Sequence, residues 1–97
     1  MIIMVAKQSE TKYSLNSSAE LRIKDDGGII YLDRKTFIIN GVGVLILKGI
    51  ESKKTKNEII KMIITEYDVT EYMASDGFDE FIDKLKHYGL LLESGHF

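Results

Sequence analysis

The stretch Ile29–Ile39, with the sequence IIYLDRKTFII, decides the fold. Two short apolar runs flank the polar turn Asp33-Arg34-Lys35, a pattern typical of a β-hairpin. The second run, Thr36–Ile39, has three successive apolar side chains, so both faces of that strand can be covered. At a sheet edge, its unpaired N–H and C=O groups would be a template for another chain. The stretch therefore predicts a sheet and a place where a further strand can add to it.

Composition bounds the class of protein. The 97 residues, 44% of them hydrophobic, suit one domain with a modest core. A net charge of −2 argues against a polyanion such as DNA as the main partner. The absence of cysteine excludes disulfides and thiolate metal sites. The apolar run Met1–Val5 is too short for a signal-peptide core, so we expect a cytoplasmic protein without a membrane segment.

Upstream of the hairpin the chain is polar at first. From Lys7 to Ser18 only two residues are suited to burial, so we expect residues 1–18 to be a flexible lead-in. Ordered structure is predicted from Ala19, because Leu21 and Ile23 alternate with charged residues in the period of a strand with one wet face.

The link between this strand and the hairpin is the sequence Asp25-Asp26-Gly27-Gly28. We expect a tight turn here, in which glycine supplies a positive φ. Sequential strands usually pair, so the three strands should form an antiparallel meander. Thr36–Ile39 then lies at an edge of the sheet.

Downstream of the hairpin the apolar period becomes helical. Asn40 is a good N-cap for a helix from about Gly41 to Lys48, and a close contact with the sheet at Gly43 would justify one of its glycines. Thr55 and Glu58 form a capping box that opens a second helix, which runs through Tyr67.

A third helix is predicted to start near Ser75 or Asp76 and to run to about Tyr88, with Gly89 as its stop. It carries a stripe of apolar side chains at helical spacing: Phe78, Phe81, Ile82, Leu85 and Tyr88. The expected fold is α+β and winged-helix-like: a three-stranded antiparallel sheet followed by three helices. This domain should span residues 19–92, with residues 93–97 as a tail.

The order and spacing of several short motifs resemble those of one family. The motifs are Ile39-Asn40-x-x-Gly43-x-x-Ile46-Leu47, Lys53-Lys54-Thr55-x-x-Glu58-Ile59, Tyr67, and Phe78-x-x-Phe81-Ile82-x-x-Leu85-x-x-x-Gly89-Leu90-Leu91. The chain resembles the PqqD family from about Leu21 to Leu92. These small winged-helix domains, called RiPP recognition elements, bind the leader part of ribosomally made precursor peptides. Ser52 and Gly77 depart from the family pattern, which usually has Gly and often Asp at those places.

The resemblance implies a non-catalytic peptide chaperone without a cofactor. In such proteins the leader adds as an antiparallel strand to the third strand and lies against the third helix. A separate modifying enzyme, such as a radical SAM enzyme or a leader peptidase, acts on the rest of the peptide. Carried over to this sequence, the binding residues are Lys35, Thr36, Phe37, Ile38 and Ile39 in the strand, with Phe78, Ile82, Leu85 and Lys86 nominated in the helix. Periodicity alone leaves open which helix residues face the groove and which face the core.

The same mechanism has a physical basis apart from the family. Main-chain hydrogen bonds to an edge strand contribute about 0.5–1.5 kcal/mol each and do not select a sequence. Side-chain pockets must provide the selectivity, so a partner peptide should carry two or three apolar or aromatic anchors at alternating positions. The competing interpretation is that Phe37–Ile39 is an ordinary buried strand.

The sequence also bears on other functions and on assembly. A winged-helix DNA-binding regulator shares the architecture, but its reading helix should be basic, and the third helix here is acidic. Gly41-x-Gly43 lacks the third glycine of a dinucleotide fingerprint, and no metal-binding or catalytic constellation can be singled out. A homodimer is a further hypothesis, formed when a second copy, or the Ile2–Val5 segment of a neighbour, adds to Thr36–Ile39.

Overall fold

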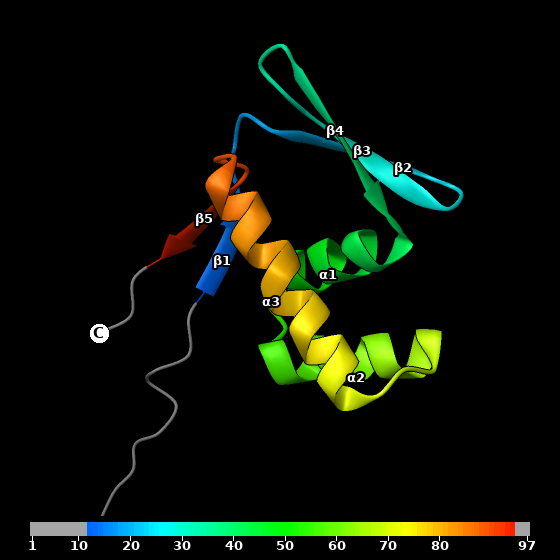
Figure 1. Cartoon of the computed structure of the whole chain (residues 1–97). Helices are drawn as coiled ribbons and strands as arrows, with labels where there is room; N and C mark the ends of the chain where they lie inside the picture. The colour runs from blue at the N-terminus through cyan, green and yellow to red at the C-terminus, as the bar shows by residue number, and fades with distance from the viewer. Residues whose placement is uncertain (1–11, 95–97) are drawn as a thin grey trace, which may run out of the picture.

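The computed structural model describes residues 12–94 and forms an α+β domain with a sheet to one side of three helices (Figure 1). In chain order the elements are β1 (Lys12–Leu15), β2 (Glu20–Lys24), β3 (Gly27–Leu32), β4 (Lys35–Asn40), α1 (Gly41–Glu51), α2 (Lys56–Tyr67), α3 (Glu71–His87) and β5 (Leu91–Ser94). β2, β3 and β4 form an antiparallel meander with β4 at one edge, and β1 pairs with β5 in a second, two-stranded sheet. The winged-helix-like prediction of a three-stranded sheet followed by three helices is confirmed.

Both turns of the meander are two residues long. Lys24 pairs with Gly27 across the first, and Leu32 pairs with Lys35 across the second. Gly27 and Gly28 therefore belong to β3, and the expectation that they supply a positive φ in the turn is wrong. Gly27 is required for a different reason: a Cβ there would collide with the carbonyl oxygen of Ile39 in β4. The positive φ in the second turn, 57°, belongs to Asp33.

The ends of the described chain are tied together, which the composition did not predict. Residues 12–15, assigned to the flexible lead-in, form β1 and pair with β5, which itself runs two residues past the expected boundary at Leu92. The backbone N–H of Asn16 donates to the Leu90 carbonyl at 2.7 Å, and the Asn16 side-chain amide donates to the Gly89 carbonyl at 2.9 Å. The apolar run Met1–Val5, with the dimer hypothesis that uses it, lies outside the described residues.

Side chains cap all three helices at their first turn. The Asn40 side chain accepts a hydrogen bond from the Gly43 N–H, and the reciprocal bonds of the Thr55–Glu58 capping box are both present, which confirms both predicted starts. α3 begins earlier than predicted, because the Thr70 hydroxyl accepts from the Met73 N–H and caps a helix that starts at Glu71. Gly77 is an interior residue of that helix. At the other end Gly89 takes a φ of 74° and ends the helix as expected.

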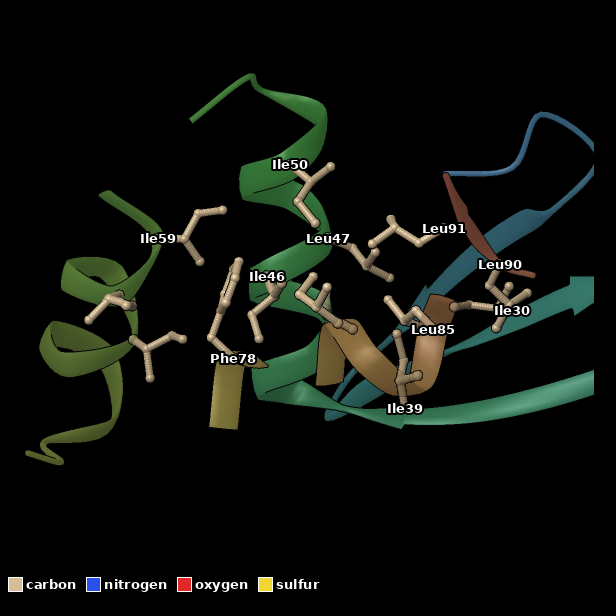
Figure 2. Packing of buried hydrophobic residues seen from close by; sticks show 14 of the residues in the cluster. Ile30, Ile39, Ile46, Leu47, Ile50, Ile59, Phe78, Leu85, Leu90 and Leu91 are labelled. Carbon is tan, nitrogen blue, oxygen red and sulfur yellow. The ribbon is translucent and has the colours of Figure 1, made fainter. Parts of the chain in front are cut away.

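The core joins the helices to the inner face of the sheet. Figure 2 shows Phe78 of α3 beside Ile46 and Ile59, whereas Leu85 and Leu90 lie toward Ile30 of β3. These side chains are almost completely buried, and the described residues bury no charged or polar side chain. Burial of apolar area, at about 25 cal/mol per Å², is therefore the main stabilising term for the arrangement of α3 against the sheet.

Replacing each of two helix glycines by alanine should change the stability in opposite directions. A Cβ at Gly49 in α1 would lie 2.6 Å from Cγ1 of Ile59, whereas a Cβ at Gly77 would meet nothing within 4 Å beyond its chain neighbours and the local helix backbone. Alanine gains up to about 1 kcal/mol of helix propensity at either position. At Gly49 the overpacking between α1 and α2 costs about 1–3 kcal/mol and outweighs this gain. Gly49→Ala should lower the melting temperature and Gly77→Ala should raise it; a lower value for Gly77→Ala would contradict the open space beside α3.

Candidate functional site

Within residues 12–94, β4 has a strand neighbour on one side only, which is β3. In a hairpin with a two-residue loop, the pair that flanks the loop is hydrogen-bonded, and every second pair after it is too. Lys35, Phe37 and Ile39 therefore direct their N–H and C=O groups toward β3. The corresponding groups of Thr36 and Ile38 point away from the sheet and are available to a further strand.

The side chains of β4 alternate between two environments. Phe37 and Ile39 point toward α3: Ile39 is buried, and the Phe37 ring lies 5.2 Å from the Tyr88 ring between centroids. Ile38 points to the opposite face and is 85% exposed. The competing interpretation of an ordinary buried strand therefore holds for Ile39 but is wrong for Ile38.

An open cleft of about 440 Å³ separates β4 from the C-terminal half of α3. Thr36 to Asn40 form its strand side; the helix side consists of Phe81, Lys84, Leu85 and Tyr88, with Leu90 beyond them. At Gly43 a Cβ would lie 2.9 Å from the Phe81 ring and 3.3 Å from Cβ of Ile39, so the glycine allows α1, β4 and α3 to meet at one point.

The predicted strand residues lie along this cleft. Thr36, Phe37, Ile38 and Ile39 line it, and Lys35 is an exposed residue at the start of β4. The strand positions nominated from the sequence are thus brought together on one element.

The nominated helix residues are not all brought to the cleft. Leu85 forms part of the floor, but Phe78 and Ile82 are only 2% and 3% exposed and belong to the core. Lys86 points instead toward β5, where its ammonium lies 2.5 Å from a Glu93 carboxylate oxygen, and this hydrogen bond raises the pKa of Lys86.

Sequence reasoning missed three residues that the helix does present to the cleft: Phe81, Lys84 and Tyr88. The signal was the width of the apolar stripe. Phe78, Ile82 and Leu85 form one row at i, i+4, i+7, and Phe81, Lys84 and Tyr88 form a second row with spacing i, i+3, i+7. Two such rows point in two directions: the first row faces the core, and the second row faces the cleft.

The cleft has the character of a binding surface. Its side chains are mainly apolar, with one ammonium group from Lys84. The part of the chain from 12 to 94 contains no group of three His, Cys, Asp or Glu side chains placed to hold a metal ion. None of the helices in that part is long and apolar enough to cross a membrane.

The β2–β4 sheet has an open edge at β4, and it lies beside α3, which turns one face to the core and one to the cleft. This arrangement defines a small winged-helix-like domain. The chain belongs to the PqqD family: the family model described as Coenzyme PQQ synthesis protein D (PqqD) matches residues 28–91. No curated protein matches the chain.

Two solved structures share the fold. The lasso peptide synthetase B1, described as complexed with the leader peptide, has a TM-score of 0.76 at 18% identity, over 84% of this chain and 98% of its own. The protein TbiB1, described as in complex with the TbiA(beta) leader peptide, has a TM-score of 0.71 at 23% identity, over 79% of this chain and 92% of its own. At these identities the likeness is one of fold.

Ile38 and Ile39, adjacent in β4, test whether only one face of the strand is buried. Ile39→Ala removes a buried side chain and should lower the free energy of unfolding by about 2–4 kcal/mol. Ile38→Ala acts on an exposed side chain and should change it by less than about 0.5 kcal/mol. Urea unfolding monitored by circular dichroism measures both, and equal losses would mean that Ile38 is covered in solution.

Proposed function

We propose that this protein is a non-catalytic peptide chaperone that captures the leader of a ribosomally synthesised precursor peptide. The leader adds as an antiparallel strand to β4 beside α3, and the protein presents it to a separate modifying enzyme. The observation that carries the proposal is the open β4 edge, with the outward backbone groups of Thr36 and Ile38 next to an apolar cleft. Membership of the PqqD family supports it, as do the leader peptides named in the two complexes of the same fold.

The two parts of the site have different tasks in this mechanism. Backbone hydrogen bonds to Thr36 and Ile38 hold any extended peptide, and the side chains that enter the cleft fix its register. Peptide side chains opposite Phe37 and Ile39 enter the cleft, where Phe81 and Tyr88 cover them. The intervening side chains emerge on the face of Ile38. A bound leader therefore needs apolar or aromatic residues at alternating positions.

The protein can present the leader to an enzyme because it contacts only a small part of the peptide. Only a short stretch of peptide is fixed along β4, and the rest remains accessible to an enzyme such as a radical SAM enzyme or a leader peptidase. We infer a cytoplasmic site of action, because that is where ribosomal precursors are made before modification.

The acidic surface of α3 weighs against the DNA-binding alternative. Asp76, Asp79, Glu80 and Asp83 are all exposed on this helix, and Lys56 is already paired with Asp79 at 2.8 Å. A helix with this charge would be repelled by the phosphates of a duplex.

Strand addition predicts that the backbone of Ile38 matters more than its side chain. Probes come from a displayed library of random peptides selected on the wild-type protein. Ile38→Pro removes an outward N–H without removing a bond to β3 and should weaken these peptides by about tenfold or more. Ile38→Ala keeps the N–H and should bind within about twofold of wild type.

Controls accompany this comparison. Circular dichroism verifies that both variants are folded. Equal binding by folded Ile38→Pro, or failure to select any peptide, would contradict the proposal. Light scattering tests the dimer hypothesis separately: a dimer mass that Ile38→Pro reduces to a monomer would show that β4 pairs with a second copy.

Two exposed tyrosines of α3 and its C-cap provide a matched pair for the cleft. Tyr88 is 52% exposed and lines the cleft beside Phe37, whereas Tyr72 is 77% exposed near the opposite end of the helix. Tyr88→Ala should weaken the selected peptides by about tenfold, because an aromatic wall of the cleft is lost. Tyr72→Ala should leave affinity unchanged. Isothermal titration measures the peptide affinity of both variants. An equal loss of affinity in the two would mean that the peptide does not bind in the cleft.

A further inference from the structure

A second hollow of about 480 Å³ opens between α1, α2 and the N-terminal half of α3. Among its lining residues are Tyr67, Val69, Met73 and Gly77. Tyr67 is 41% exposed and Met73 57% exposed, so apolar side chains face an open space here. The proposed strand addition does not use this hollow.

The hollow continues directly from the cleft beside β4. Asn40, Phe81 and Lys84 line both, so the two depressions share one border. β4 runs from Lys35 to Asn40 and therefore points toward the hollow. A peptide added antiparallel to β4 has its N-terminal end at Asn40. Residues upstream of the added strand thus leave the cleft at the entrance to the hollow.

Gly77 supplies an independent reason to expect an occupant. A glycine inside a helix costs about 1 kcal/mol relative to alanine. Gly77 has no positive φ, and apart from its two chain neighbours and the nearby backbone of α3, no described atom lies within 4 Å of the place of its Cβ. Neither backbone conformation nor internal packing requires it. A glycine at this position leaves room for a group from outside the chain to approach the helix backbone closely.

We propose that the bound peptide continues upstream of the added strand into the hollow and places an apolar side chain over Gly77, between Tyr67 and Met73. This deepens the proposed function and rests on it. The peptides recognised then form a narrower class, with alternating anchors for the β4 cleft and one further apolar anchor on their N-terminal side. The one acid and one base at the hollow, Glu80 and Lys84, offset each other and favour an uncharged anchor.

The test fills the hollow and shortens the peptide in the same titration series. Gly77→Leu should weaken library-selected peptides by about tenfold. Peptides truncated upstream of the strand should bind wild type about tenfold more weakly and should be insensitive to Gly77→Leu, because both changes remove the same contact. Asp76→Leu places the same side chain at an exposed neighbouring position that does not line the hollow and should have no effect.

The outcomes separate the two proposals. Wild-type affinity of Gly77→Leu, with binding still lost in Ile38→Pro, would overturn the inference and leave strand addition intact. Loss of the Gly77→Leu effect on shortening the C-terminal end would also overturn it, because the peptide would then run parallel to β4.

Cross-linking gives a second measurement that does not depend on affinity. The chain contains no cysteine, so Gly77→Cys introduces a unique thiol. A peptide whose N-terminal cysteine is activated as a mixed disulfide should couple to this thiol by exchange, with release of the activating thiol, and a peptide activated at a C-terminal cysteine should not. Coupling of the C-terminal end only, or of neither end, would contradict the proposed course of the peptide.

Discussion

The register of the β3–β4 hairpin is the constraint on which the rest of the site depends. The two-residue loop pairs Leu32 with Lys35, and a shift of one residue would turn every side chain of β4 to the other face. In the observed register, Ile39 is in the core and Phe37 meets Tyr88. The same register sends the backbone groups of Ile38 outward. One short turn thus determines both the anchoring of the strand and the part of it that stays available.

α3 carries two rows of side chains, one that packs in the core and one that lines the cleft. The row of Phe78, Ile82 and Leu85 is buried and fixes the helix against α1, α2 and the sheet. The other row faces the cleft, where Phe81 approaches α1 closely enough that only glycine fits at position 43. Because the first row is buried, the helix backbone that carries the second row is held in place before any ligand arrives. A preorganised surface of this kind loses little entropy on binding.

Local signals in the sequence predicted most of the fold and part of the site. The hairpin, the caps at Asn40 and Thr55 and the stop at Gly89 depend on neighbouring residues, and they were found correctly. β1 was missed because its partner β5 lies more than 70 residues away, and its own composition is polar. The cleft-facing row of α3 was missed for a related reason: periodicity identifies an apolar stripe, but only the placement of the sheet tells which part of it the core covers.

The pairing of β1 with β5 bears on how such a domain is combined with others. Lys12 stands opposite Ser94, so the described chain enters and leaves the domain at adjacent points (Figure 1). The open edge belongs to the other sheet, and neither crossing point lies on it. A domain with neighbouring entry and exit can be inserted into a surface loop of a larger protein with little strain on either partner. This arrangement keeps both ends of the described chain on a different sheet from the β4 edge, as insertion between other segments would require.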